Sequence, residues 1–467
     1  MAHNKITKIS PLQGIDKKKV ISFLIVIALA YFLGKSIVRA GDPILISLML
    51  FAFTLTSAIV YRLEIGVYLS VFVLMNLTSS IFINTNTITI GPISLPGPLA
   101  FITVCTIALA ITFRIVNRRP INFLEPRWMI PLMIIMALFV LFFMNDHGVR
   151  GANVWRLQAL LRGVAFYLLV VLVLENPGQI YRLIRILSIS YLFFSLAYIY
   201  VSIGGGYGYQ SLESEYTTNI SAHGAIGALI NLFIPICIGA FIVETKWIWR
   251  TMFMLSLLSN ILFCVLTFSR SGALGLFVSF AAWMILGLRY FSRKMVVGIG
   301  MGIAVVLVFN VMFRLDISDS LLRDANYLQY MYARTERDLL SNSDSARKYL
   351  YLNAWQTIKE NPLSGIGAGN QPSHSLFLGA GLDGGIFFMG IWLIIFAVLI
   401  MRSYRLWRSM ISDPVWGPIT LGLFISMAYS FINNWYDMIL YSIQYGLIFW
   451  LLRGIESVLI NARKYKT

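Results

Sequence analysis

Long, uninterrupted apolar runs constrain this chain more than any other feature. Runs of about 17 to 21 mostly apolar residues recur from end to end, which is the length that an α-helix needs to cross the hydrocarbon core of a bilayer. Only helices and closed barrels satisfy their backbone polar groups inside a membrane, and barrel strands are shorter and alternate in polarity. Of the 467 residues, 58% are hydrophobic and 12% are charged. The sequence therefore predicts an all-α polytopic integral membrane protein.

We predict about fourteen membrane-spanning helices. They cover residues 20–38, 43–61, 65–83, 97–116, 128–144, 160–175, 183–203, 223–243, 250–269, 272–288, 295–313, 384–401, 415–432 and 437–453. The resulting organisation is an N-terminal tail (1–19), helices 1–11 (20–313), one large outer loop between helices 11 and 12 (314–383), helices 12–14 (384–453) and a C-terminal tail (454–467). We expect the first run to be retained as a span, because no small-residue cleavage site follows it.

The basic residues predict the orientation. A net charge of +17 could indicate nucleic-acid binding, but the basic residues cluster in alternate loops, which is typical of cytoplasmic loops in membrane proteins. The clusters are Lys17 to Lys19, Arg118 with Arg119 and Arg127, Arg182 with Arg185, Lys246 with Arg250, Arg289 with Arg293 and Lys294, Arg402 with Arg405 and Arg408, and Arg463 with Lys464 and Lys466. We therefore expect both termini to be cytoplasmic.

A second set of arginines falls on the predicted outer side, against this bias. They are Arg39, Arg150, Arg156, Arg162, Arg270, Arg314, Arg323, Arg334, Arg337 and Arg347. Such residues are candidates for binding an anion, and a lipid phosphate or diphosphate is the natural one at a membrane. The alternative is that they pair with carboxylates of the outer loop or with lipid head groups. Arg162 and Arg270 stand out because they lie at the ends of spans with no carboxylate nearby in the sequence.

The outer loop contains one clear helix signal. Ser343 or Asp344 is a suitable N-cap and Asn361 with Pro362 a stop, so 345–360 is predicted to be helical. Arg347, Tyr351 and Trp355 recur every four residues and share a face of this helix. A guanidinium followed by two aromatic rings suits a diphosphate-linked sugar. The same pattern also suits a helix that docks on the membrane interface through its aromatics.

His374 follows this helix and a glycine-rich stretch. A neutral imidazole there could accept a proton from an attacking hydroxyl, although a histidine near an interface is often a hydrogen-bonded structural residue. His223, after Asn219, lies at the outer start of the eighth predicted span. The outer loops contain no acidic or histidine-rich cluster of the kind that binds a metal, so we expect neither a metal site nor another cofactor.

These residues together resemble the O-antigen ligase and O-antigen polymerase superfamily. The resemblance rests on Thr267 to Gly275 (TFSRSGALG), a large outer loop, Arg347 and Trp355, Asn361 to Gly367 (NPLSGIG), and His374 to Leu378 (HSLFL) before a glycine-rich start to a span. It covers about residues 150 to 400. Ser375, Asp383 and Phe388 depart from the commonest residues of the family, which weakens the case for the ligase branch.

The resemblance implies a GT-C-like membrane glycosyltransferase. Its members transfer a glycan from an undecaprenyl-diphosphate carrier to an acceptor hydroxyl at the periplasmic face of the bacterial inner membrane. By this resemblance His374, Arg270 and Arg347 are the catalytic candidates. The candidates for binding diphosphate and sugar are Arg162, Arg156, Tyr351, Trp355, Asn219 and His223. With no evident pair of outer carboxylates, a single inverting displacement is favoured over a double displacement.

Two branches of the family and one other class of protein stay open. A polymerase adds the glycan to another lipid-linked glycan, together with a separate chain-length regulator, whereas a ligase adds it to lipid A-core. The predicted number of spans and the departures after His374 favour the polymerase. A transporter or flippase of lipid-linked glycans would also place arginines in a cavity, but it should carry ionisable groups near the middle of its spans, and we expect few of them here. Sugar identity, linkage and oligomeric state are not encoded by any motif.

Overall fold

The computed structural model is a helical bundle. It describes residue 59 and residues 62–76, 87–90, 93–116, 150–204, 222–266, 270–291, 343–367, 371, 373–436 and 438–464. The predicted N-terminal tail and the predicted spans at 20–38, 128–144 and 295–313 lie outside these ranges, as does almost all of 43–61. The structure supports a polytopic all-α membrane protein, while the number fourteen stays a prediction.

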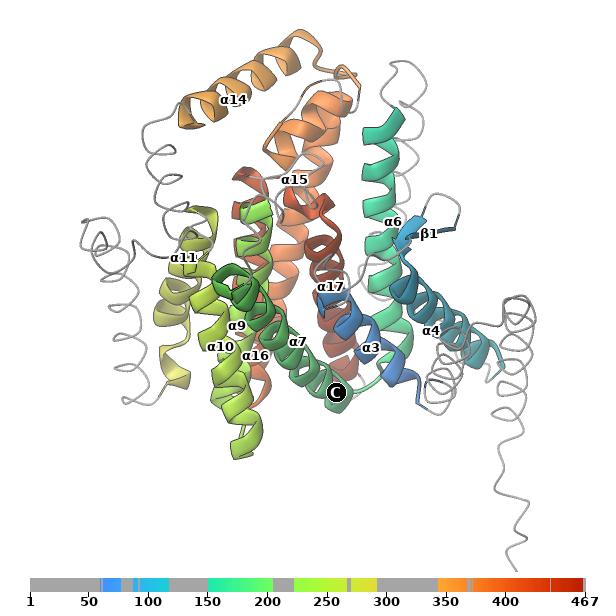
Figure 1. The fold of residues 1–467 in the computed structure, drawn as a ribbon, viewed down its shortest axis with the longest axis vertical. Coiled ribbons are helices and arrows are strands. Elements are labelled where there is room, and N and C mark those ends of the chain that lie inside the picture. Colours follow the sequence, from blue (N-terminus) through green and yellow to red (C-terminus); the bar gives the residue numbers. More distant parts are fainter. Residues whose placement is uncertain are drawn as a thin grey trace, which may run out of the picture.

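Helices joined by short loops, such as α6 with α7 and α9 with α10, run in opposite directions (Figure 1). Their bounds are α3 Leu63–Asn76, α4 Gly97–Val116, α6 Arg150–Val173, α7 Pro177–Gly204, α9 Ala222–Val243, α10 Trp247–Leu266, α11 Arg270–Leu286, α14 Ser343–Glu360, α15 Leu376–Met410, α16 Trp416–Tyr436 and α17 Ile443–Lys464. Two short 3-10 helices, η3 (Leu288–Tyr290) and η5 (Ile439–Tyr441), follow α11 and α16.

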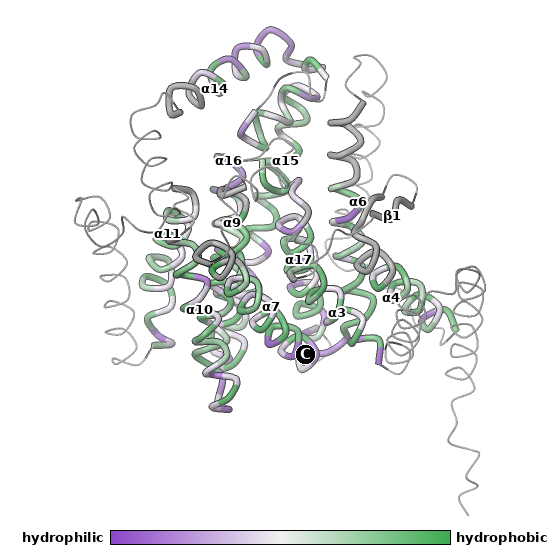
Figure 2. Tube along the Cα trace, in the orientation of Figure 1, coloured by the Kyte–Doolittle hydropathy of each residue, from purple (hydrophilic) through white to green (hydrophobic). Residues whose placement is uncertain are grey.

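Five described helices are long and apolar enough to cross a membrane. They are Pro177–Ala197, Ile226–Val243, Trp247–Cys264, Leu376–Met410 and Gln444–Arg463. Shorter apolar helices are Leu63–Met75, Ile102–Val116, Ala159–Val173 and Gly272–Leu286. Figure 2 shows hydrophobic residues along the bundle helices and hydrophilic residues along α14, which lies across one end of the bundle. This contrast distinguishes α14 from the apolar helices of the bundle.

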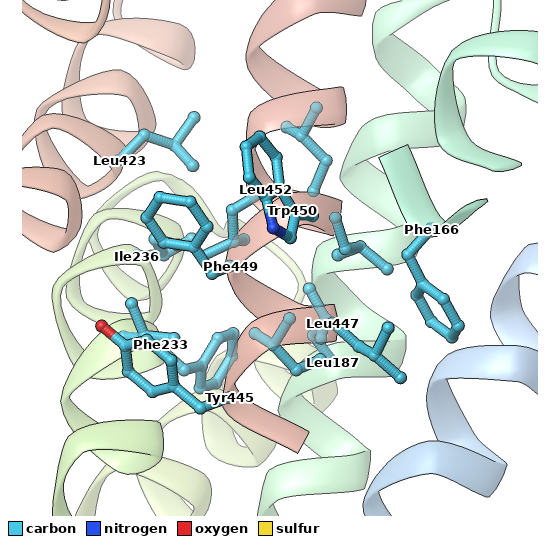
Figure 3. Packing of buried hydrophobic residues seen from close by; sticks show 14 of the residues in the cluster. Phe166, Leu187, Phe233, Ile236, Leu423, Tyr445, Leu447, Phe449, Trp450 and Leu452 are labelled. Atoms are coloured by element: carbon cyan, nitrogen blue, oxygen red, sulfur yellow. The ribbon is translucent and has the colours of Figure 1, made fainter. Parts of the chain in front are cut away.

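The core lies where α9, α16, α6 and α17 pack on one another. Buried Phe166, Phe233, Tyr445 and Trp450 meet there (Figure 3). The α9 and α16 backbones approach closely at Gly422, where an added Cβ would lie 2.4 Å from the Pro235 carbonyl oxygen. Small residues allow such contacts in membrane bundles, where lipid gives helices little hydrophobic reason to associate.

The helices α6 and α15 begin well before the predicted spans. The helix α6 starts at Arg150, ten residues before the predicted span, so Arg150 and Arg156 lie on a helix and not in a loop. The helix α15 starts at Leu376, within the segment predicted as outer loop. Its first turn is stabilised because the Ser375 hydroxyl accepts a hydrogen bond from the Leu378 amide (3.4 Å).

The last helix is shifted relative to the prediction. Residues 437–453 were predicted as the span and 454–467 as a tail, but α17 covers Ile443–Lys464. The charges at Arg453 and Glu456 look like the end of a span in the sequence. Both side chains are fully buried and paired with each other at 2.7 Å, so the helix continues through them.

The sequence analysis did not anticipate one short hairpin. Strands β1 (Thr87–Ile90) and β2 (Ile93–Pro96) pair antiparallel, with Ile90 opposite Ile93. Threonine and isoleucine alternate along β1, and Gly91 with Pro92 separates the two strands in the sequence. The pattern is too short to stand out beside the apolar runs that surround it.

Candidate functional site

The elements that carry the candidate residues meet at one end of the bundle. The N-termini of α11, α15 and α17, the C-terminus of α16 and the helix α14 all lie there (Figure 1). A direct contact joins two of them, because the Tyr351 hydroxyl of α14 donates a hydrogen bond to the Tyr436 carbonyl at the end of α16 (2.9 Å). We refer to this end as the His374 end.

His374 sits in a tight turn immediately before α15. The Ser373 hydroxyl accepts a hydrogen bond from the Ser375 amide and donates one to the Ser375 carbonyl, both at 3.1 Å. Ser375 then caps the helix, so the residues on both sides of His374 are fixed by side-chain hydrogen bonds. The half-buried imidazole therefore projects from a preorganised turn and not from a free loop.

The turn rests on an aromatic cluster. The Phe377 ring is buried and lies 5.2 Å from the Trp435 ring and 5.4 Å from the Phe431 ring, between centroids. Trp435 and Tyr436 remain 48% and 46% exposed. Partly exposed aromatic rings at the end of a span suit the membrane interface or the apolar face of a sugar.

The helix α15 is broken at Gly384 and Gly385, about two turns after it starts. Gly384 has φ −145° and ψ 24°, and Gly385 has φ 73° and ψ −170°. The second pair of angles belongs to a region that only glycine adopts readily. A short half-helix, 376–383, therefore carries the His374 turn and is set off from the long span that begins at Ile386.

The motif 361–367 clamps this break. The Ile366 amide donates to the Leu382 carbonyl (2.7 Å), and the Ile386 amide donates to the Pro362 carbonyl (2.8 Å). The approach is so close that a Cβ on Gly365 would lie 2.3 Å from the Leu382 carbonyl oxygen. We call residues 361–367 and 382–386 the glycine clamp. It fixes the half-helix relative to both α14 and the span.

The helix α14 is joined to the same region by side chains. Ser343–Glu360 includes the whole predicted helix 345–360 and ends before Asn361, as predicted. The Thr357 hydroxyl donates to the Gln371 side-chain carbonyl (3.0 Å). Trp355 is 41% exposed, and the Lys359 ammonium lies 5.9 Å from the centre of its ring. Arg347 lies one turn before Tyr351 on α14, and its side chain is outside the described part of the structure.

Arg270 is the first residue of α11, and α10 ends at Leu266. Arg270 therefore lies at the junction of two helices, as predicted. Its side chain is not described, but the backbone around it is anchored. The buried Asn231 side chain of α9 donates to the Gly272 carbonyl (2.8 Å) and to the Gly227 carbonyl (2.9 Å). Asn231 thereby holds the start of α11 against α9.

Arg162 is a buried candidate residue. It lies on α6 and is 4% exposed. The neighbouring Gly163 allows α6 to contact α17 closely, since a Cβ there would lie 2.2 Å from the Trp450 ring. Arg156 lies about two turns earlier on α6 and His223 near the start of α9, both without described side chains, and Asn219 lies outside the described residues.

Four other arginines form ion pairs at the opposite end of the bundle. Arg185 pairs with Glu244 at 2.6 Å, Arg114 pairs with Glu175 at 3.7 Å, and Glu64 pairs with both Arg182 (2.8 Å) and Arg62 (3.9 Å). Burial alone would raise the pKa of Glu244, but hydrogen bonds from Arg185, from the Lys246 amide and from Tyr181 outweigh it and lower that pKa. Arg182 and Arg185 are among the residues predicted to face the cytoplasm.

The sequence analysis missed the ionisable pair inside α17. Arg453 and Glu456 are fully buried, so the expectation that the spans carry few ionisable groups away from their ends is wrong for this helix. Their spacing of three residues, which brings side chains together on one helix face, was the available signal. Across the described ranges, no group of three or more His, Cys, Asp and Glu side chains is placed to hold a metal ion.

The comparison with known families concerns the same region. Residues 252–393 match the family model Wzy_C, described as O-antigen ligase. Over this segment, the match supports the O-antigen ligase and polymerase superfamily. The matched segment runs from α10 through Arg270, α14, the glycine clamp and His374 into α15. Members of this family are glycosyltransferase-like membrane enzymes that act on lipid-linked glycans. A search of curated proteins finds no match for the chain.

Proposed function

We propose that this protein is a glycosyltransferase of the bacterial inner membrane. It takes a glycan from an undecaprenyl-diphosphate carrier and transfers it to an acceptor hydroxyl at the outer face. We propose further that the acceptor is another lipid-linked glycan, which makes the protein a polymerase of O-antigen or a related surface polysaccharide. A separate chain-length regulator is the expected partner, and both termini lie in the cytoplasm.

One observation carries the proposal. The segment matched to the O-antigen ligase family contains Arg270, Arg347 and His374, and the elements that carry all three lie at the same end of the bundle (Figure 1). Arg270 is far in sequence from Arg347 and His374. A shared end of the bundle gives a membrane-embedded diphosphate and an acceptor hydroxyl a place to meet.

The chemistry that we propose is a single displacement. The acceptor hydroxyl oxygen forms a bond to the anomeric carbon of the donor while the bond from that carbon to the diphosphate oxygen breaks. The electron pair leaves with undecaprenyl diphosphate, and the hydroxyl proton passes to the His374 imidazole. The negative charge on the leaving diphosphate grows during this step, and Arg270 and Arg347, with Arg162, stabilise it. Neither a metal ion nor a nucleotide takes part in the proposed step.

The remaining candidates contact the donor away from the reacting carbon. We propose that Arg156 and Arg162 on α6 bind the diphosphate, and that Tyr351 and Trp355 on α14 lie against the sugar rings. Trp355 is exposed enough to receive a sugar face, whereas the Tyr351 hydroxyl already holds α14 to α16. Asn219 and His223, at the start of α9, complete the proposed binding set.

A ligase is the second candidate, and the description of the matched family as O-antigen ligase favours it. The two functions differ only in the acceptor. The deciding experiment incubates the purified protein in nanodiscs with undecaprenyl-diphosphate-linked repeat units, with and without lipid A-core. Longer lipid-linked chains without lipid A-core support the polymerase. Product that requires lipid A-core makes the protein a ligase, and bound but unconverted donor under both conditions refutes the enzyme and favours a transporter.

A further inference from the structure

The end of the bundle opposite His374 contains a second group of arginines that the proposed reaction does not use. Arg402 of α15 and Arg453 of α17 face a single carboxylate, Glu456, together with Ser403 and Ser457. We call these five residues the arginine cluster. Arg402 lies about 24 Å along α15 from Ile386 at the rise of an α-helix, so the cluster is remote from the glycine clamp and from His374.

The contacts within the cluster are short. Arg453 Nη1 donates to Glu456 Oε1 (2.7 Å) and to Ser403 Oγ (2.9 Å), and the Ser403 hydroxyl donates to the same carboxylate oxygen (2.6 Å). Arg402 donates through Nη2 to the Ser457 hydroxyl. The Tyr167 hydroxyl of α6 lies 3.1 Å from that hydroxyl. The cluster therefore links α15, α17 and α6.

The cluster lacks a negative group. Two guanidinium groups and one carboxylate leave one positive charge, and Arg453 and Glu456 are 0% exposed. Four buried donor atoms, Nε and Nη1 of Arg402 and Nε and Nη2 of Arg453, make no hydrogen bond in the structure, against one such acceptor, Oε2 of Glu456. Buried donors and charges are normally compensated, as in the pair at this end of the bundle in which the buried Glu244 carboxylate lies 2.6 Å from Arg185.

We propose that the arginine cluster binds one phosphate group, and that the group is the head-group phosphodiester of a membrane phospholipid. A phosphodiester carries the single negative charge that the cluster lacks, and its oxygens match the fork of donors on a guanidinium. Arg402 is half-buried, whereas Arg453 is enclosed, so the ligand reaches the cluster past Arg402.

The position of Arg402 fits a lipid. A hydrocarbon core of about 30 Å that starts near Ile386 ends about 6 Å beyond Arg402 along α15, so a long arginine side chain can reach the head groups from there. The preceding residue on α15, Met401, is 49% exposed, and it offers an apolar surface for an acyl chain. Inorganic phosphate from solution is the other source of the same chemistry.

The test measures ligand binding to the full-length protein in a neutral detergent after removal of lipid. Phosphatidylglycerol and inorganic phosphate are the two probes, with native mass spectrometry and thermal shift as readouts. Arg402→Gln removes one guanidinium and the excess charge while leaving the Arg453–Glu456 pair intact. Arg405→Gln is the matched control, because Arg405 is an exposed arginine on the same helix.

We expect one phosphatidylglycerol per protein, bound about tenfold more weakly or worse by Arg402→Gln and unchanged in Arg405→Gln. Glu456→Gln, which raises the net charge of the cluster, should strengthen binding. Displacement of the lipid by millimolar phosphate would support the site and identify free anion as its source. Equal binding by wild type and Arg402→Gln, or equal losses in the Arg402 and Arg405 variants, would overturn the proposal. Because no readout depends on glycosyl transfer, its failure is distinct from failure of the proposed enzyme.

Discussion

Replacing Gly385 by alanine should disrupt the glycine clamp while leaving the rest of the bundle in place. Gly385 has φ 73° and ψ −170°, a conformation that costs a residue with a side chain about 1–3 kcal/mol. The added Cβ would also lie 2.4 Å from the Pro362 carbonyl oxygen and 2.6 Å from the Leu363 carbonyl group. Backbone atoms cannot move aside as a flexible side chain would.

The two costs act together because the clamp resists relaxation. Moving Pro362 away weakens the 2.8 Å hydrogen bond that its carbonyl accepts from Ile386. An overpacked contact adds about 1–3 kcal/mol, so the total falls at about 2–6 kcal/mol. If the half-helix separates from the loop instead, the structure is retained but the His374 turn is displaced. Activity falls sharply in either case.

Gly390→Ala is the matched control on the same helix. An added Cβ there meets nothing within 4 Å, and replacing glycine by alanine inside a helix stabilises it by about 0.5–1 kcal/mol. Thermal unfolding in detergent and glycan transfer would be measured for both variants. The reasoning is refuted if Gly385→Ala is as stable and as active as Gly390→Ala.

Three further predictions concern other parts of the molecule. Glu244→Gln should destabilise the protein by about 3 kcal/mol at pH 7, because it breaks a buried ion pair with Arg185. The pKa of Glu244 is lowered in the folded state. The stabilisation from the pair is therefore present above the unfolded pKa of about 4.3 and is lost as pH falls through the folded pKa. The unfolding free energies of wild type and variant should converge toward pH 3, and a constant difference between them would count against the pair. Asn231→Ala should cost about 1–3 kcal/mol, since it leaves the buried Gly272 carbonyl without that donor, and should reduce transfer by loosening the start of α11; unchanged unfolding and activity would show that Asn231 does not anchor the helix. If neutral His374 is the base, transfer should fall as pH is lowered from 8 to 5, measured over a range in which unfolding is unaffected, and a flat rate would argue against that role.

Composition and motif order predicted much of the fold at the His374 end. The apolar runs indicated the spans, and α4 has the bounds that the sequence indicates. The stop at Asn361 and the junction at Arg270 were also predicted correctly. These features depend on local signals, namely uninterrupted hydrophobicity and residues that begin or end a helix, and local signals are legible in a single sequence.

The features that the sequence did not reveal depend on contacts between distant segments. The break in α15 needs the carbonyl of Pro362 beside Gly385, and nothing in the run of glycines before the span distinguishes a turn from a clamped half-helix. Arg453 and Glu456 resembled the end of a span because only tertiary packing shows that both charges are buried. The roles of His374, Arg270 and Arg347 stay predictions, because the structure describes their positions in the chain and not a bound donor.

The central claim is that His374 acts on the acceptor while Arg270 and Arg347 act on the leaving diphosphate. The most direct measurement compares donor binding and single-turnover transfer for wild type, His374→Ala, Arg270→Ala and Arg347→Ala in nanodiscs, with Gly390→Ala as control. We expect His374→Ala to bind the undecaprenyl-diphosphate donor as wild type does but to transfer at least about a hundredfold more slowly, and the two arginine variants to lose transfer and donor affinity together. Transfer at the wild-type rate by His374→Ala, or by both arginine variants, would contradict the account.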